Sequence, residues 1–173
     1  MSFAQPSWPK VLPDAVVVGL ATLGPIGRRL PAPGTWGSLA GLGFFWVGFR
    51  GLSPGWMLAV SAVAAYGAVA ICGEAEERLR KKDPGEVILD EFVAMPLCFL
   101  GWPTLIAGAP VPAWAVGLAG FALFRVFDIL KPFGIARLQS LRAGLGVVVD
   151  DLAAALAAGG VMHLAIWIWN GRL

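Results

Sequence analysis

The chain has 173 residues, of which 58% are apolar and only 14% are charged, and its mean hydropathy is +0.75. Soluble domains are about 45–50% apolar and about 25% charged, so this composition excludes an ordinary water-soluble enzyme and predicts an integral membrane protein. The formal net charge of +2, with basic residues clustered near apolar runs, also argues against a nucleic-acid-binding protein.

Apolar runs recur along the chain. Residues 15–23 are too short to cross a bilayer and are expected to lie on its surface, whereas 38–49 is a marginal span that stops before Arg50. A spanning helix needs about 20 apolar residues. Four longer runs approach this length: 56–72, 88–108, 112–127 and 147–169. The predicted fold is an all-α, polytopic membrane helical bundle, a single domain over residues 1–173 with four or five membrane-embedded helices.

Lys and Arg predict the orientation of this bundle, because they are enriched in short cytoplasmic loops. The basic residues form three groups: Arg28 and Arg29; Arg78, Arg80, Lys81 and Lys82; and Arg125, Lys131, Arg137 and Arg142. If each run crosses the membrane once, all three groups fall on the cytoplasmic face. The opposite interface would then be anchored by four tryptophans: Trp102, Trp114, Trp167 and Trp169.

Four polar motifs adjoin the basic groups: PGTWGSL (33–39), DPGEVILDE (83–91), FRVFDILKP (124–132) and GLGVVVDDL (144–152). Ionisable residues at the rim of apolar helices are costly and by default mark a functional site. Clustered carboxylates without His or Cys are hard oxygen ligands, which favour Mg²⁺ over Zn²⁺. Neighbouring Arg and Lys side chains would bind a phosphoryl group. The motifs therefore predict a phosphate ester at the membrane surface as the substrate.

The acids of the second motif divide into two pairs. Asp83 and Glu86, with Pro84 between them, fit the N-cap and N3 positions of a helix, so helix capping competes with a supporting role behind the site. Asp90 and Glu91 would then lie past the first helical turn, where a cap cannot use them. Neither has a Lys or Arg within four residues along the chain, which favours a functional role.

The other motifs also leave alternatives open. Arg125, Asp128 and Lys131 recur every third residue and share a helix face, as a phosphate site or as an intrahelical ion pair. Asp150 and Asp151 are adjacent and point about 100° apart on a helix, so one or both could reach a shared metal.

Small and isolated polar residues complete the candidates. The glycine turn before Thr35 and Ser38 could direct N–H groups and hydroxyls at an anion, or these residues could only cap a helix. His163, within the last apolar run, is expected to be a hydrogen-bonded structural residue. Cys72 and Cys98 lie in apolar runs, too far apart for a CxxC pair, and are expected to be buried free thiols.

Taken in order and spacing, the four motifs resemble the signatures of the phosphatidylglycerophosphatase A family over roughly residues 14–160. The resemblance implies a Mg²⁺-dependent enzyme of the bacterial inner membrane that removes the terminal phosphate of phosphatidylglycerophosphate to give phosphatidylglycerol. It also implies about six helices around a central one. Three positions depart from the family pattern: Gly134, Ala143 and Val149. The positions that match are Asp83, Asp90, Glu91, Arg125, Asp128, Lys131, Asp150 and Asp151.

The resulting hypothesis assigns one role to each group of residues. The catalytic residues are Asp90, Glu91, Asp128, Asp150 and Asp151, and the Mg²⁺ ligands among them are Asp90, Glu91, Asp150 and Asp151. The phosphate-binding residues are Thr35, Ser38, Arg125 and Lys131, with Asp83 and Glu86 in support. The expected partners are the membrane and an anionic phospholipid substrate. The alternative is a small transporter or proton relay, which would place its acids near the bilayer midplane.

Overall fold

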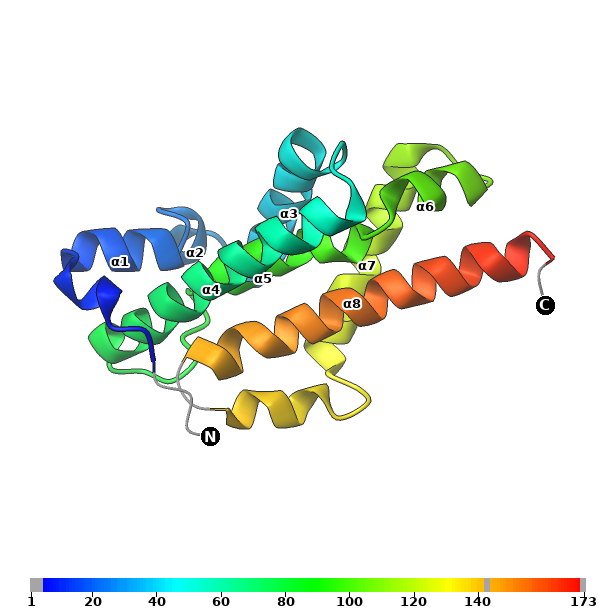
Figure 1. Cartoon of the computed structure of the whole chain (residues 1–173). Coiled ribbons are helices and arrows are strands. Elements are labelled where there is room, and N and C mark those ends of the chain that lie inside the picture. The colour runs from blue at the N-terminus through cyan, green and yellow to red at the C-terminus, as the bar shows by residue number, and fades with distance from the viewer. Residues whose placement is uncertain (1–4, 142–143, 172–173) are drawn as a thin grey trace.

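The chain folds into helices that pack side by side in an elongated bundle (Figure 1). The computed structural model describes residues 5–141 and 144–171, so Arg142 and Ala143 lie outside the described residues. The α-helices are α1 (Asp14–Ala21), α2 (Ile26–Arg29), α3 (Pro33–Phe44), α4 (Pro54–Leu79), α5 (Leu89–Ala94), α6 (Trp102–Gly108), α7 (Ala113–Leu130) and α8 (Gly144–Trp169). Shorter 3₁₀ or π elements are η1 (Trp8–Val11), η2 (Phe45–Phe49), η3 (Met95–Phe99) and η4 (Ile135–Ser140). The described residues contain no strand, which confirms the all-α prediction.

Within residues 5–141 and 144–171, three helices are long and apolar enough to cross a membrane: α4, α7 and α8. They cover the predicted runs 56–72, 112–127 and 147–169. The fourth predicted run, 88–108, is not one straight helix. Its two parts, Leu89–Phe99 and Trp102–Gly108, meet at an angle of 56°, so the structure supports three spans, or four if this bent pair is counted as one.

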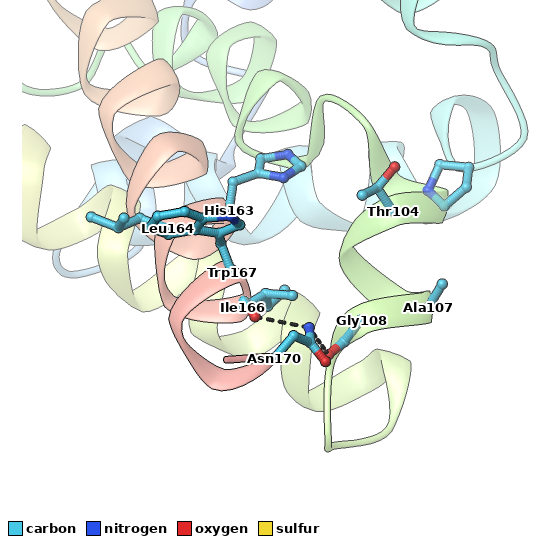
Figure 2. A pocket seen from close by; sticks show the side chains of 9 residues that line it. Thr104, Ala107, Gly108, His163, Leu164, Ile166, Trp167 and Asn170 are labelled. Atoms are coloured by element: carbon cyan, nitrogen blue, oxygen red, sulfur yellow. Dashed lines mark hydrogen bonds between the residues drawn. The ribbon is translucent and has the colours of Figure 1, made fainter. Parts of the chain in front are cut away.

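The bend lies at Leu100 and Gly101, where the backbone leaves the helical region and Gly101 takes a positive φ of 77°. The break frees a carbonyl group that a membrane interior could not solvate. The Nε2 atom of His163 on α8 lies 2.8 Å from the Leu100 carbonyl oxygen, and it donates this hydrogen bond because a carbonyl oxygen can only accept. The predicted structural role of His163 is confirmed. Asn170 donates to the Gly108 carbonyl at the other end of α6 (Figure 2).

The two shorter apolar runs do not form candidate spans. Residues 15–23 become α1, a helix of 8 residues, and residues 38–49 become the second part of α3 followed by the π-helical turn η2. Aromatic packing holds this turn against the bend, with the Phe45 and Phe99 ring centroids 4.3 Å apart. Trp102 joins the same cluster and is only 5% exposed, so the prediction that it anchors an interface is wrong. The other three tryptophans of that prediction, Trp114, Trp167 and Trp169, are exposed.

Glycines allow α3 to lie directly against α5. A Cβ atom at Gly41 would lie 2.7 Å from the Phe92 carbonyl oxygen, so only a residue without a side chain permits this approach. Small residues play this part in many membrane helix pairs, because they let the backbones come close. As a result, the beginning of α3 lies beside the beginning of α5. The buried thiols Cys72 and Cys98 are unpaired, as the sequence predicts.

Candidate active site

The segment before α5 is a turn and not the predicted start of a helix. The Val87 N–H donates to the Pro84 carbonyl, and the Ile88 N–H donates to the Ala21 carbonyl at the end of α1. These bonds hold the backbone out of the helical path until Leu89, and Ile88 takes the N-cap position. The expectation that Asp83 and Glu86 cap this helix is therefore wrong.

Asp83 and Glu86 differ in their exposure. Asp83 is exposed, has a positive φ of 47°, and donates its N–H to Glu76 Oε1 at 2.6 Å. Glu86 is half-buried. Because the helix starts late, Asp90 and Glu91 lie in its first turn, and not beyond it as the sequence suggested.

Three carboxylates from two helices converge at this point. Oxygen atoms of Asp90, Glu91 and Asp151 all lie within 4.8 Å of one another, although 49 residues of sequence separate the end of α5 from the start of α8. Asp90 and Asp151 are buried, with 6% and 3% of their surface exposed. One oxygen of each of the three side chains is buried without a hydrogen-bond partner in the described part of the chain.

This arrangement fits a hard divalent cation. Buried carboxylate oxygens without donors are costly, and like charges brought this close repel each other unless a cation lies between them. All the available ligand atoms are oxygens, the type that Mg²⁺ prefers. Asp90, Glu91 and Asp151 could therefore hold Mg²⁺ between α5 and α8.

Two cations from the end of α7 border the carboxylates. Arg125 Nη1 lies 2.6 Å from Asp128 Oδ2 and 3.8 Å from Glu91 Oε1. Lys131 Nζ lies 3.7 Å from Asp128 Oδ1 and donates a short hydrogen bond to Asp150 Oδ2. Asp128 thus bridges both cations, so the predicted intrahelical ion pairs exist within the site.

Lys131 is a cation at neutral pH. Burial by itself lowers the pKa of an ammonium group, but the hydrogen bond to Asp150 and the charges of Asp150, Asp151 and Asp128 outweigh it and raise the pKa of Lys131 above its usual value. Lys131 ends α7 with a left-handed backbone (φ 44°), and this conformation turns the chain back toward α8. Gly134, which departs from the family pattern, has a φ of 84°, a conformation that proline cannot adopt.

Asp150 and Asp151 have different surroundings. Asp151 is grouped with Asp90 and Glu91, whereas Asp150, at 2% exposure, pairs with Lys131. Their separation follows from the rotation of about 100° between adjacent helical residues. Of the four predicted metal ligands, the structure brings three together and pairs the fourth, Asp150, with Lys131.

Ser38, in the second turn of α3, contacts Arg125. Ser38 is fully buried; its Oγ donates to the Gly34 carbonyl at 2.8 Å and accepts from Arg125 Nη1 at 3.2 Å. Thr35 is half-buried, and the N-cap of α3 is Ala32, so neither hydroxyl caps this helix. Ser38 is thus placed to orient Arg125, and its burial keeps it from direct contact with a substrate.

Gly34, in the glycine turn that the sequence suggested as an anion site, lies against two residues of the carboxylate and cation clusters. A Cβ atom there would collide with Glu91 Oε1 and lie 3.2 Å from Arg125 Nη1. A side chain at this position would therefore force the Glu91 carboxylate and the Arg125 guanidinium to move. The position of Gly34 in PGTWGSL was the available signal.

A cavity of about 830 Å³ lies elsewhere and does not contain these residues. It lies between α6 and the end of α8 and is lined by apolar side chains with Thr104, His163 and Asn170 (Figure 2). Asp151 and His163 are separated by roughly 18 Å along α8, at 1.5 Å per residue. The carboxylate cluster is identified by its chemistry and not by cavity size.

Comparison with known proteins identifies the family. Residues 19–166 match the family model described as Phosphatidylglycerophosphatase A. The chain is 37% identical over 142 residues to Phosphatidylglycerophosphatase A of Haemophilus influenzae, covering 80% of this chain and 81% of that protein. It is 31% identical to Phosphatidylglycerophosphatase A of Escherichia coli, covering 79% and 76%.

A further relative carries a different name. The chain is 31% identical to a protein of Bacteroides thetaiotaomicron named "Putative phosphatidylinositol-3-phosphatase", covering 79% of this chain and 85% of that protein. No solved structure matches the chain significantly. The family match spans all four motifs and every residue of the carboxylate and cation clusters, and the chain therefore belongs to the phosphatidylglycerophosphatase A family.

Proposed function

We propose that this chain is a Mg²⁺-dependent lipid phosphatase that hydrolyses phosphatidylglycerophosphate to phosphatidylglycerol and inorganic phosphate. The family and the names of two relatives support this substrate. In the reaction, water adds across the terminal phosphorus–oxygen bond, so that the phosphate leaves and the glycerol head group keeps a hydroxyl.

The observation that carries the proposal is the close grouping of three carboxylates beside two paired cations. Asp90, Glu91 and Asp151 would hold the Mg²⁺ ion. A bound Mg²⁺ supplies Lewis-acid stabilisation of the negative charge that develops on the transferred phosphoryl group. This role requires oxygen ligands on rigid helices, and α5 and α8 provide them.

The cations would bind the terminal phosphate. Arg125 offers a planar fork that matches two phosphate oxygens, and Lys131 offers a point charge. Asp128 holds both side chains in place, while Asp150 orients Lys131 and Ser38 orients Arg125. Fixed donors of this kind assist catalysis because they need no rearrangement as charge develops.

The membrane setting follows from the apolar helices, and we place the site at the cytoplasmic face of the bacterial inner membrane. The site joins the beginnings of α3, α5 and α8 with the end of α7, next to the basic groups that favour the cytoplasm. Its position at helix ends also favours the enzyme over the transporter alternative, which would need acids near the midplane.

The test is phosphate release by the purified full-length chain from phosphatidylglycerophosphate in neutral detergent micelles. We expect release with Mg²⁺, loss of release with EDTA, and recovery when excess Mg²⁺ is added. Asp90→Asn and Asp151→Asn should reduce turnover at least about 100-fold. The exposed acid Glu77 provides a matched control, since Glu77→Gln should leave turnover unchanged. Wild-type rates for both aspartate variants, or rates that EDTA does not affect, would overturn the proposal.

Head-group selectivity needs its own comparison, because one relative is named for a phosphoinositide. Phosphatidylinositol 3-phosphate and a soluble phosphomonoester should be offered at the same concentration. The proposal requires phosphatidylglycerophosphate to have the highest kcat/KM of the three.

A further inference from the structure

A groove separate from the carboxylate site lies between α1 and α2. Its volume is about 750 Å³, and the α1 side of its lining includes Ala15, Val18 and Gly19. The turn that closes it contains Gly24, whose positive φ of 67° lets its N–H donate to the Gly19 carbonyl at 2.7 Å. This turn ends α1 and folds the chain back, so that α2 follows α1 closely (Figure 1).

Two adjacent guanidinium groups line the groove. Arg28 and Arg29 are both exposed, and in the described residues neither forms an ion pair. The interior arginines differ, because Arg78 and Arg125 are each paired with carboxylates. In the described part of the chain, no acidic residue lines the groove. The charge of the groove is therefore positive and is not neutralised by the protein.

Most of the remaining lining is apolar and includes Ala15, Val18 and Pro25. Thr22 is the polar exception, and its hydroxyl is hydrogen-bonded to backbone carbonyl groups. Elsewhere on α1, Val16 and Leu20 are 43% and 49% exposed. An arginine pair beside an apolar helix matches a molecule with a phosphate at one end and hydrocarbon at the other. An anionic phospholipid has this chemistry and surrounds a membrane protein at high concentration.

We propose that this groove binds an anionic phospholipid of the surrounding bilayer, with its phosphodiester on Arg28 and Arg29 and an acyl chain along Ala15 and Val18. This site is distinct from the carboxylate cluster and would be occupied by a lipid that is not the substrate.

The groove is also connected to the carboxylate cluster. At the end of α1 the Ala21 carbonyl accepts from the Ile88 N–H at 2.9 Å, two residues before Asp90. A Cβ atom at Gly27 would collide with the Glu86 carbonyl oxygen, so α2 lies directly against the same segment. A lipid that holds α1 and α2 together therefore supports the backbone from which α5 begins.

The test measures lipid binding by the full-length chain in neutral detergent, using native mass spectrometry. Dioctanoylphosphatidylserine is the anionic probe, and dioctanoylphosphatidylcholine is the neutral reference. The double variant Arg28→Gln/Arg29→Gln should bind the anionic probe about tenfold or more weakly, with unchanged binding of the neutral lipid. Arg50→Gln/Arg137→Gln removes the same charge outside the groove and should change binding less than about twofold.

A steric variant tests the groove without changing charge. A Cβ atom at Gly19 meets nothing within 4 Å, so Gly19→Leu should fill the groove without disturbing the backbone and should weaken binding of the anionic probe. Gly67 on α4 is equally open, and Gly67→Leu is the matched control. Asp90→Asn, which removes a residue of the carboxylate cluster, should bind the probe as the wild type does.

Three results would overturn the proposal. The first is wild-type affinity for the anionic probe in both the arginine double variant and Gly19→Leu. The second is an equal loss in the Arg50/Arg137 control, which would indicate a diffuse effect of net charge. The third is loss of binding in Asp90→Asn, which would place the lipid at the carboxylate cluster. Because the readout is binding, the result does not depend on whether the proposed phosphatase activity is found.

Discussion

Replacing Asp150 and Asp151 with asparagine, one at a time, should produce two different defects. Asp151 belongs to the three-carboxylate group. Asp150 contributes no oxygen atom to that group and forms an ion pair with Lys131 instead. We therefore expect Asp151→Asn to raise the Mg²⁺ concentration for half-maximal activity about 100-fold or more. Asp150→Asn should leave this concentration within about threefold of the wild-type value and should lower kcat/KM instead.

The size of the Asp150 effect follows from the contacts of Lys131. A hydrogen bond to a charged partner contributes about 1.5–3 kcal/mol, and about 1.4 kcal/mol corresponds to a tenfold change in rate or affinity. Lys131 would keep Asp128, whose Oδ1 lies 3.7 Å away, so part of its orientation should survive. The expected loss in kcat/KM is therefore about tenfold, at the lower end of this range.

The assay is phosphate release from the lipid at several Mg²⁺ and substrate concentrations, with Glu77→Gln as the control. Thermal unfolding in detergent should first establish that each variant is folded. An equal rise in Mg²⁺ requirement for Asp150→Asn and Asp151→Asn would refute the distinction and would make Asp150 a metal ligand.

Three further substitutions test the support of the site and the fold. Ser38→Ala removes the hydroxyl that contacts both Arg125 and the Gly34 carbonyl, and we expect kcat/KM to fall about tenfold with little change in Mg²⁺ requirement. Gly34→Ala places a methyl group against Glu91 and Arg125, and activity should fall more than tenfold, by roughly 1.4 kcal/mol or more of transition-state stabilisation. Arg78→Met breaks the pair with buried Glu74 and the bonds to the Pro9 and Leu12 carbonyls, and thermal unfolding should show a loss of about 3–5 kcal/mol.

Each of these substitutions has a matched control in the same chain. Ser61→Ala removes a buried hydroxyl that has no hydrogen-bond partner among the residues that the structure describes, and Gly43→Ala adds a methyl group to α3 where none of those residues lies within 4 Å. Both should retain wild-type kinetics. Arg80→Met removes an exposed charge next to the Arg78 region and should leave the unfolding midpoint unchanged. If a control and its test variant behave alike, the corresponding contact has no special role.

The all-α class and the segments that carry the candidate site could be predicted from the sequence, because both depend on local composition. Runs of apolar residues indicate helices that partition into lipid, and α4, α7 and α8 cover three predicted runs. The break at Leu100 was not apparent, because the 88–108 run is apolar on both sides of the bend. Its stability depends on His163, which lies 63 positions away in the sequence.

The start of α5 is a second feature that the local sequence did not predict correctly. Asp83, Pro84 and Glu86 have the local pattern of a helix start, and an isolated peptide would favour that interpretation. In the folded chain, the Ile88 N–H pairs with the Ala21 carbonyl of α1. A tertiary hydrogen bond thus overrides the local preference and shifts the helix start to Leu89.

Local composition is enough to predict that the protein is helical and apolar, and to pick out the acids and bases whose burial is costly. How these residues pair is visible in the folded chain alone: Asp151 groups with Asp90 and Glu91, Asp150 pairs with Lys131, and Ser38 contacts Arg125. The free-energy cost of burying a charged side chain can be judged from the residue and the apolar segment that contains it. Pairing depends on how α3, α5, α7 and α8 pack, and their contacts join residues far apart in the chain.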